Sequence, residues 1–363
     1  MTVALVFAAG WLAAWLLMWR PLGLTRSVAA PTIPVAVVVP ARNEATTISE
    51  LLDAIAAQVN KAAAVVVVDD QSSDATATIA TYHASRPSVV TGQALAAGWA
   101  GKPWAMHQGV QRANELCPDP LIVFLDADVS LSPEALGSIA AAHARHRGLV
   151  SVAPFHRTER FHESLSAVFN AVSIGATGIA LPGRHGRTWA AFGPCVAISS
   201  ADLERIGGIE SIASSVVDDL DLARAAHDAR LPVHGFTGGE LVRFRMYPSG
   251  PGPLFEGWTK NIALGFGRTP KLLGFLGFLW ITALLMPMAA LATAGTTTAV
   301  VTEVLVAFQS TVLLRRIGRF RFSTPFLMPL LAVVFVAVFL RSAVLVLTRR
   351  PVRWRGRSVP TRR

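Results

Sequence analysis

Four long apolar runs limit what this chain can fold into, because one lies at its start and three lie close together near its end. The first covers residues 1–19, contains no charged side chain and is followed by Arg20 and Arg26. A signal peptide would have basic residues before its apolar core, so this run is predicted to be a retained membrane anchor. The others are close to the roughly 20 residues that a helix needs to cross a bilayer, and they cover about residues 272–292, 297–314 and 326–347.

The composition agrees with a membrane protein. Of the 363 residues, 52% are hydrophobic and 15% are charged, and the mean hydropathy of +0.46 is too high for an ordinary soluble enzyme. The net charge of +10 comes from the C-terminal end, where 12 Arg and no Lys, Asp or Glu follow Leu314. Because these arginines flank apolar runs, anionic lipid headgroups are their expected partners, and nucleic acid is not. The two cysteines provide no disulfide framework, which fits a reducing compartment.

Basic residues near the apolar runs predict the orientation in the membrane. Arg20 and Arg26 on one side, and Arg268 and Lys271 on the other, place residues 20–271 in the cytoplasm. We therefore expect a multi-pass protein of the cell membrane whose domain between the anchors lies in the cytoplasm.

The last apolar run, residues 326–347, does not fit this scheme simply. If it crossed the membrane once, the Arg-rich tail after it would lie on the opposite side from the basic loop at residues 315–321. Either this run is re-entrant or interfacial, or the number of spans differs. Arg341 within the run favours the first alternative.

Between the anchors, the sequence is typical of an α/β domain. Residues 33–39 (IPVAVVV), 62–68 (AAAVVVV) and 121–125 (LIVFL) are continuous apolar runs with turn residues after them. Helix-length segments separate them, for example residues 46–58. Strands that are apolar on both faces and alternate with helices predict a mainly parallel sheet covered on both sides. In such sheets, ligands bind beyond the carboxyl ends of the strands.

Polar and acidic residues follow each of these three strands. The first strand ends in PARNEA (residues 40–45), the second in DDQSSDAT (69–76) and the third in DAD (126–128). One acidic turn would be unremarkable, but three at the same edge of a parallel sheet indicate a functional site.

These motifs resemble glycosyltransferase family 2, whose members have a GT-A nucleotide-sugar-binding fold. The resemblance covers about residues 33–240 and depends on the order of the motifs PARNE, VVVDDQSSDAT, GKPWAMHQG, FLDADV, GPCVAISSADLERIGG and DDLDLA. With GWAGK (98–102), GWTKN (257–261) and the anchors, the chain resembles the membrane-bound branch that glycosylates carotenoid acids and hopanoids.

The resemblance implies an α/β, Rossmann-like GT-A domain in the cytoplasm with transmembrane helices at both ends of the chain. The expected segments are an N-terminal anchor, a catalytic domain, an interfacial segment, a C-terminal transmembrane region and a basic tail, at residues 1–20, 31–250, 251–271, 272–348 and 349–363 respectively.

The resemblance also implies a metal site in the DAD motif. Bare carboxylates would repel a nucleotide-sugar diphosphate, whereas Mg²⁺ or Mn²⁺ prefers oxygen ligands and bridges phosphate oxygens. In the family, the second aspartate of the motif contacts the metal and the first lies near the ribose. These roles correspond to Asp128 and Asp126.

Nucleotide contacts are implied for other positions in the same way. Asp69 and Asp70 match the turn that reads the nucleobase, where a carboxylate accepts the uracil N–H. The first loop would meet the nucleotide through Pro40, Arg42 and Glu44. Lys102 either lies close to the phosphates or is a solvated loop lysine.

The last acidic motif, VVDDLDLA, covers residues 216–223. Family members commonly have glutamate where this chain has Asp218, and Asp219 matches the general base that takes the proton of the acceptor hydroxyl. Asp221 either takes part in the site or only begins a helix, favoured by the helix dipole. If the acceptor is a carboxylic acid, it is already ionised, and Asp219 would position it instead.

One departure from the family concerns its polymer-forming members, which have a Gln-x-x-Arg-Trp motif that this chain does not contain. Trp258 and Lys260 occupy the corresponding stretch and are candidates for contact with the acceptor or the membrane interface. Residues 161–180 are expected to form a buried or interfacial helix. His143 and His146, three apart on an expected helix, are expected to face solvent.

The function implied is an inverting, metal-dependent glycosyltransferase. It would move a single sugar, with glucose expected, from a UDP-sugar to a carotenoid acid, hopanoid or polyprenyl acceptor, without an obligate protein partner. A haloacid-dehalogenase-type phosphotransferase would need a lysine between its nucleophile and its later acidic pair, and no lysine lies between Lys102 and Lys260. The remaining alternative is a non-catalytic module that only binds nucleotide sugars.

Overall fold

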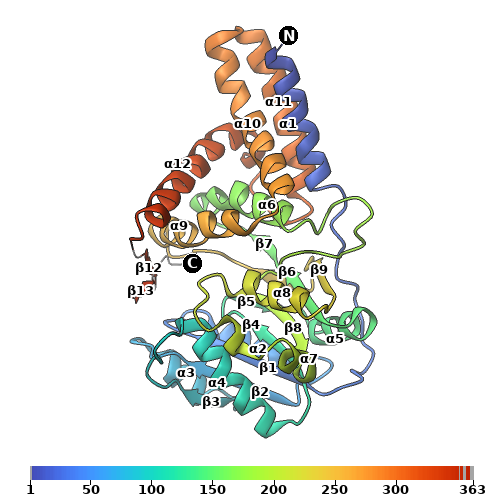
Figure 1. Cartoon of the computed structure of the whole chain (residues 1–363), viewed down its shortest axis with the longest axis vertical. Helices are drawn as coiled ribbons and strands as arrows, with labels where there is room; N and C mark the ends of the chain where they lie inside the picture. Colours follow the sequence, from blue (N-terminus) through green and yellow to red (C-terminus); the bar gives the residue numbers. More distant parts are fainter. Residues whose placement is uncertain (1, 351, 355–356, 360–363) are drawn as a thin grey trace. The chain divides into compact units, whose positions relative to one another are not determined.

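The structure is a computed structural model that describes residues 2–350, 352–354 and 357–359. It divides into two compact units, and the chain passes from one unit to the other four times (Figure 1). The catalytic unit consists of residues 23–155 and 187–244. The membrane unit consists of residues 1–22, 156–186 and 245–363, so that the segment 156–186 belongs with the terminal helices.

A seven-stranded sheet forms the centre of the catalytic unit, with the order β3-β2-β1-β4-β8-β6-β9. All strands except β8 run in the same direction, since β8 is antiparallel to both β4 and β6. The strands are β1 (Val35–Ala41), β2 (Ala64–Asp69), β3 (Ser88–Thr91), β4 (Leu121–Leu125), β6 (Leu149–Ala153), β8 (Cys195–Ser199) and β9 (Val233–Thr237). The predicted mainly parallel α/β fold is confirmed.

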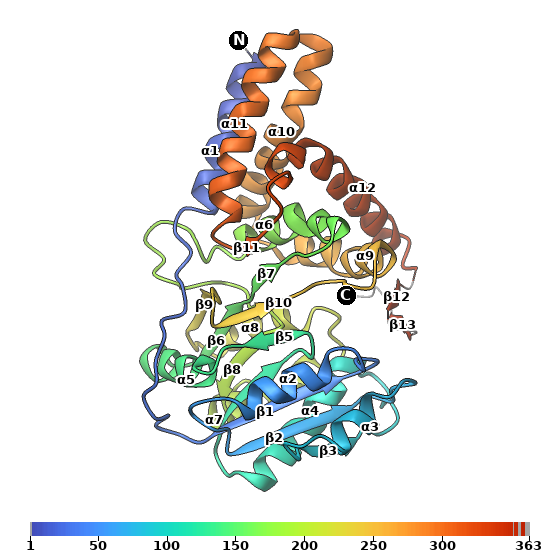
Figure 2. The same ribbon diagram turned by 180° about the vertical axis from the view of Figure 1, so that it is seen from behind.

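Helices cover both faces of this sheet, because its central strands are apolar on both sides. One face packs against α2 (Ile48–Ala56), α3 (Thr76–Thr81) and α5 (Ala135–His146) (Figure 2). The other face packs against α4 (Gly101–Leu116), α7 (Ser200–Arg205), the 3₁₀ helix η2 (Ile209–Ile212) and α8 (Asp218–Asp228). A short antiparallel pair, β5 (Val129–Leu131) with β10 (Val242–Phe244), follows the DAD turn.

The membrane unit contains three long apolar helices near the C-terminus, with the spans Lys271–Thr293, Thr296–Leu314 and Thr324–Leu347. They are α10 (Lys271–Thr293), α11 (Thr296–Leu314) and the 3₁₀ helix η3 (Thr324–Leu327) with α12 (Met328–Leu347). Their length and composition suit a membrane. The N-terminal helix α1 (Thr2–Leu17) lies along α10 and α11, whereas α12 diverges from this bundle (Figures 1 and 2).

The other elements of the membrane unit lie below this bundle. They are β7 (Phe155–Arg157), η1 (Phe161–Leu165), α6 (Ser166–Ala176), α9 (Pro251–Arg268), β11 (Gly318–Arg319), β12 (Val352–Trp354) and β13 (Arg357–Val359). Almost all of α6 is buried, and it contacts α9, α10 and α12. Of the two alternatives for residues 161–180, a buried or an interfacial helix, the burial of α6 supports the buried one.

Hydrogen bonds attach α1 to α11 across almost the whole length of the sequence. The Trp11 indole donates to the carbonyl of Leu305 at 3.2 Å, and Gln309 donates to the carbonyl of Trp11 at 2.7 Å. At the end of α1, Arg316 donates to the carbonyls of Met18 and Trp19. A guanidinium at a helix C-terminus satisfies carbonyls that have no partner within the helix. The anchor is therefore an integral part of the membrane unit.

Candidate functional site

The acidic residues of the site come from neighbouring strand ends. Strands β2 and β4 both pair with β1 in parallel, so that Asp69 and the DAD turn lie at the same edge of the sheet. The turn itself is held by its backbone, since Asp126 N donates to Pro194 O at 3.0 Å and Val129 N donates to Asp126 O at 3.2 Å. Asp126 and Asp128 flank the buried Ala127.

Lys102, in the first turn of α4, joins two of the predicted acidic motifs. Its Nζ lies 2.8 Å from Asp126 Oδ1 and 3.2 Å from Asp218 Oδ2. Burial alone would lower the pKa of the ammonium, but the attraction of Asp126 and Asp218 outweighs it and raises the pKa above its usual value. Of the two alternatives for Lys102, these contacts favour a place beside the acidic motifs over that of a solvated loop lysine.

Asp219 follows Asp218 at the start of α8, in an environment that favours its protonated form. Burial and the adjacent Asp218 raise the pKa of Asp219 to about 6, although Lys102 and two backbone hydrogen bonds act in the opposite direction. Those bonds come from Gly193 N to Oδ2 at 2.9 Å and from Leu220 N to Oδ1 at 3.0 Å. They hold the carboxylate in one orientation.

Asp221 has a local structural role. Its Oδ2 accepts a hydrogen bond from the Ser215 hydroxyl at 2.5 Å, which ties the first turn of α8 to the preceding loop. Of the two alternatives for this residue, the contact supports the helix-terminal one.

Asp69 presents an acceptor atom that the described residues do not satisfy. Its side chain is 7% exposed, and Oδ2 accepts from Ser72 N at 3.3 Å. Oδ1 is buried and has no partner within the described part of the chain. Since an unsatisfied buried acceptor is costly, a ligand N–H is the natural complement for this atom. The adjacent Asp70 is equally buried, and its N–H donates to Ala41 O at 2.8 Å.

The PARNE loop is braced against the loop after β2. Arg42 donates to the carbonyls of Asp70 and Gln71, so that its guanidinium supports the turn after β2. Glu44 accepts from the Thr47 hydroxyl at 3.1 Å. Pro40 is half-buried in β1, opposite Val68 of β2.

Two contributors were missed by sequence reasoning. Asn43 has a positive φ of 54°, and its Oδ1 accepts from Ser73 N at 2.8 Å, which links the two loops. Gly193 donates to Asp219, and a Cβ at Gly193 would lie 3.4 Å from both Asp219 Oδ2 and Lys102 Nζ. The GPC triplet within the matched motif is the sequence signal for this glycine.

The oxygen atoms available as ligands at this edge of the sheet are compatible with a divalent metal ion. Asp126 and Asp128 supply carboxylate oxygens, and a cationic group already lies against Asp126. Among the residues that the structure describes, no group of three His, Cys, Asp or Glu forms a ready-made metal cage. Mg²⁺ commonly uses one or two carboxylates together with substrate phosphates, so two aspartates at a strand end fit this kind of site.

Trp258 and Lys260 belong to α9 in the membrane unit. Trp258 is 7% exposed, stacks on Phe169 at 4.9 Å and donates from Nε1 to the Ser166 hydroxyl at 3.1 Å. Its indole therefore anchors α9 on α6. Lys260, two residues further along α9, is half-buried.

The expectation that His143 and His146 face solvent is wrong for His143, which is 4% exposed. The last turns of α5 still cover the sheet, and this packing buries the ring. His146 is half-buried, and its ring lies 4.5 Å from that of His234 on β9.

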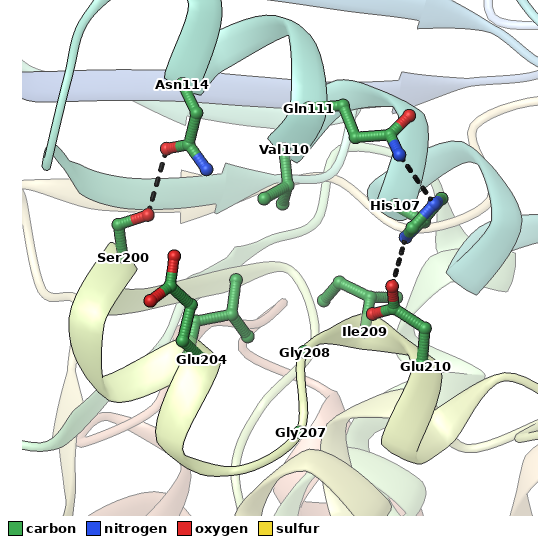
Figure 3. A pocket seen from close by; sticks show the side chains of 11 residues that line it. His107, Val110, Gln111, Asn114, Ser200, Glu204, Gly207, Gly208, Ile209 and Glu210 are labelled. Atoms are coloured by element: carbon green, nitrogen blue, oxygen red, sulfur yellow. Dashed lines mark hydrogen bonds and ion pairs between the residues drawn. The ribbon is translucent and has the colours of Figure 1, made fainter.

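A pocket of about 460 Å³ lies elsewhere in the catalytic unit, between α4 and the α7–η2 segment (Figure 3). Its polar side chains pair with one another: Ser200 with Asn114 at 2.9 Å, and His107 with Gln111 at 3.0 Å and with Glu210 at 3.3 Å. None of the predicted site residues lines this pocket.

In sequence, the chain is similar to known glycosyltransferases. The sequence pattern described as Glycosyl transferase family 2 matches residues 36–202. A 4,4'-diaponeurosporenoate glycosyltransferase from Staphylococcus haemolyticus (strain JCSC1435) is 31% identical over 349 residues, covering 90% of this chain and 88% of the relative. Its counterpart from Staphylococcus aureus (strain USA300) is 32% identical over 334 residues, covering 89% and 87%.

Among solved structures, the chain is similar to a mannosyltransferase from Pyrobaculum calidifontis in complex with GDP-Man and Mn²⁺. The TM-score is 0.54 at 18% identity, and the match covers 94% of this chain and 97% of the other. This likeness is one of fold.

Proposed function

Because the chain belongs to glycosyltransferase family 2, we propose that this glycosyltransferase moves one sugar from a UDP-sugar to a lipid-soluble acceptor, with a divalent metal and with inversion at the anomeric carbon. Glucose is the sugar we expect. The observation that carries the proposal is the cluster around Lys102, where its ammonium joins Asp126 of the DAD motif to Asp218, the neighbour of Asp219. A carboxylate of the DAD motif and the carboxylate next to the proposed base thus contact the same ammonium group.

Asp69 supports uracil as the nucleobase. Its Oδ1 is buried without a partner, whereas Oδ2 already accepts from Ser72 N. Uracil offers one ring N–H, which matches one free oxygen. Guanine offers two adjacent donors, which pair best with both oxygens of a carboxylate. Asp69→Asn should therefore weaken UDP inhibition roughly tenfold, and equal weakening of UDP and GDP would contradict this assignment.

Asp128, with Asp126 beside it, would hold the Mg²⁺ or Mn²⁺ ion. The Mn²⁺ in the mannosyltransferase of similar fold supports a divalent ion here. Such an ion supplies Lewis-acid stabilisation of the departing diphosphate. Lys102 adds a second positive charge next to Asp126.

Asp219 is the proposed base for a hydroxyl acceptor. A pKa of about 6 leaves the carboxylate ionised at neutral pH yet more basic than an ordinary aspartate. The bonds from Gly193 and Leu220 orient it towards one position of the acceptor oxygen. With a carboxylic acid acceptor, Asp219 would only position the substrate. Near-normal turnover of Asp219→Asn would exclude general-base catalysis.

The acceptor class follows from the relatives and the membrane unit. The names of the two relatives refer to diaponeurosporenoate, a carotenoid acid, and hopanoid or polyprenyl acceptors are the alternatives. Helices of suitable length and composition would hold the enzyme in the bilayer in which such acceptors dissolve. Attachment there raises the effective concentration of the acceptor.

We propose that α1, α10 and α11 cross the cell membrane and that η3–α12 is re-entrant or interfacial, so that both of its ends lie on the cytoplasmic side. Before this segment, β11 pairs with β7, and after it β12 packs against α9. The starts of η1 and α9 are themselves tied together, since Arg160 donates to Pro248 O at 3.0 Å. A reporter fused to the C-terminus should therefore be cytoplasmic, and a periplasmic signal would refute re-entry.

Membranes containing the protein, supplied with radiolabelled UDP-glucose, Mg²⁺ and candidate lipid acids or alcohols, test the function directly. Labelled lipid and released UDP are expected in equal amounts. Asp128→Asn should abolish both, whereas Asp53→Asn, which changes an exposed carboxylate on α2, should not. Nucleotide-sugar binding without either product would contradict the proposal.

A further inference from the structure

Side chains from other segments contact helix α9 at two successive turns. Tyr247 makes the first of these contacts. Its phenol lies over Gly257, where an added Cβ would lie 2.2 Å from the phenol oxygen. Tyr247 has a φ of 56°, in the left-handed region that residues with a side chain rarely adopt. Glycine at position 257 is therefore required for this contact.

The surrounding contacts hold Tyr247 in that conformation. His162 donates to the carbonyl of Tyr247 at 3.0 Å, and Arg160 donates to the carbonyl of Pro248 at 3.0 Å. Next to them, Arg245 forms a 2.7 Å ion pair with the fully buried Glu163. The segment 245–248 is thus attached to η1, and it carries the phenol ring onto α9.

Ser342 of α12 makes the second contact, one turn further along α9. Its hydroxyl donates to the carbonyl of Thr259 at 2.5 Å and accepts from the N–H of Ala263 at 3.3 Å. These two backbone groups pair with each other in a regular α-helix. Ser342 therefore ties both groups of this turn of α9 to α12. Ser342 is 1% exposed, so the bridge is shielded from bulk solvent.

The bridged turn carries Lys260. Its neighbours Trp258, Thr259 and Ile262 are buried, while Lys260 is half-buried and Asn261 is exposed. The rotation of α9 is therefore fixed, and Lys260 lies at the boundary between its packed face and its polar face. An acid-terminated lipid has the matching chemistry, with an apolar chain for the packed helices and a carboxylate for the ammonium.

We propose that Ser342 is a positioning residue for the acceptor, because its hydroxyl sets the turn of α9 that presents Lys260 to the carboxylate of an acid-terminated lipid. This inference rests on the proposed function and names the acceptor end that the membrane unit recognises. It requires no change at the carboxylates of the catalytic unit.

Ser342→Ala tests the bridge. The Michaelis constant for the lipid acid should rise roughly tenfold, as expected when one buried hydrogen-bonded bridge is lost. The Michaelis constant for UDP-glucose and the slow hydrolysis of the donor without acceptor should not change. Ser342→Thr, which keeps the hydroxyl, should restore the acceptor constant. Thr282→Val is the matched control, because that hydroxyl bonds only within its own helix, to Phe278 O.

Substitutions of Lys260 test whether its positive charge binds the carboxylate of the acceptor. Lys260→Met should raise the Michaelis constant for the acid but not for the corresponding alcohol, and Lys260→Arg should preserve acid binding. An unchanged acceptor constant in Ser342→Ala, or equal losses with donor and acceptor, would overturn the proposal.

A measurement on the wild-type protein covers the case in which Ser342→Ala does not fold. The lipid acid, but not UDP, should slow the acetylation of Lys260 by a water-soluble ester, and absence of protection would overturn the inference. Failure of this inference can be distinguished from failure of the proposed function. A wild-type protein that glycosylates no lipid contradicts the function, whereas an active one with a normal acceptor constant in Ser342→Ala contradicts only this inference.

Discussion

The two compact units of this protein have opposite charge. By sequence, the catalytic unit carries 13 Lys and Arg against 19 Asp and Glu, and the membrane unit carries 20 against 4. The acidic unit concentrates carboxylates at strand ends, where they suit a metal ion and the groups around it. The basic unit has its excess charge beside apolar helices, which is the pattern expected for contact with anionic headgroups.

The units also use their buried polar groups differently. In the catalytic unit, the buried Asp69 and the DAD turn lie at the same edge of the sheet, where ligands of such folds bind, and Lys102 contacts Asp126 of that turn. In the membrane unit, Gln309 and Ser342 are committed to backbone groups of neighbouring helices. Lipid offers no hydrogen bonds, so polar side chains there satisfy the protein itself. Substitutions of these polar residues should therefore lower the activity when they are made in the catalytic unit. In the membrane unit they should disturb the packing of the helices.

The largest effect is expected at the DAD motif. Asp128→Asn removes the charge of the proposed metal ligand and should lower kcat/KM roughly a thousandfold, about 4 kcal/mol of transition-state stabilisation. Excess Mn²⁺ should rescue part of the loss, and the unfolding temperature should not fall. Retention of more than a tenth of the activity would show that the metal is held elsewhere.

The next effect concerns Lys102 and the pH profile with a hydroxyl acceptor. Asp219 has a raised pKa, so its basic form is lost as the pH falls through about 6, and kcat/KM should fall with it. Lys102 lowers this pKa, so Lys102→Met should move the acid limb to higher pH and lower the plateau roughly a hundredfold. Lys61→Met, an exposed lysine, is the control. If the acid limb of the pH profile did not move in Lys102→Met, Lys102 would not influence the pKa of the proposed base.

Assembly of the membrane unit should depend on Gly10. A Cβ at this position would lie 2.1 Å from the carbonyl oxygen of Leu279, because α1 and α10 pack backbone to backbone. Gly10→Leu should destabilise the membrane unit by about 1–3 kcal/mol. Gly277→Leu, where nothing lies within 4 Å, should have little effect. Thermal unfolding in detergent with and without UDP measures both, and UDP affinity should be unchanged in each variant.

The smallest effect is the acid stability of the catalytic unit. Burial and the neighbouring His146 and Arg187 lower the pKa of His234 to about 4. The unfolded chain takes up a proton near pH 6.5 and the folded one does not, so stability should fall as the pH drops from 6.5 towards 4. His234→Phe should flatten this dependence, and His185→Gln, at an exposed site, should not. An unchanged slope in His234→Phe would place the acid sensitivity in other groups.

Much of the catalytic fold was predictable because its central strands are continuously apolar. The runs at 33–39, 62–68 and 121–125 correspond to β1, β2 and β4. Strand β3 was missed because its four residues, half-buried at the sheet edge, have no distinctive pattern. The reversed direction of β8 also has no local signal, since burial on both faces looks the same in either direction.

Side-chain roles were less predictable, because they depend on contacts between distant segments. His143 has the sequence context of a surface histidine and is buried by the packing of α5. Trp258 was a candidate at the interface, and its indole is held by Phe169 and Ser166. Nothing in the sequence near Lys102 indicates that it contacts both Asp126 and Asp218.

The sequence by itself determined the alternation of strands and helices, the acidic strand ends and the terminal apolar helices, because apolar runs and strand-ending turns are local properties of the chain. Only the tertiary structure decided which polar groups meet: Lys102 with two aspartates, Gly193 with Asp219, and Ser342 with the backbone of α9. Hydrogen bonds and ion pairs act over a few ångströms. Residues far apart in the chain reach that distance only after the sheet and the helices have packed.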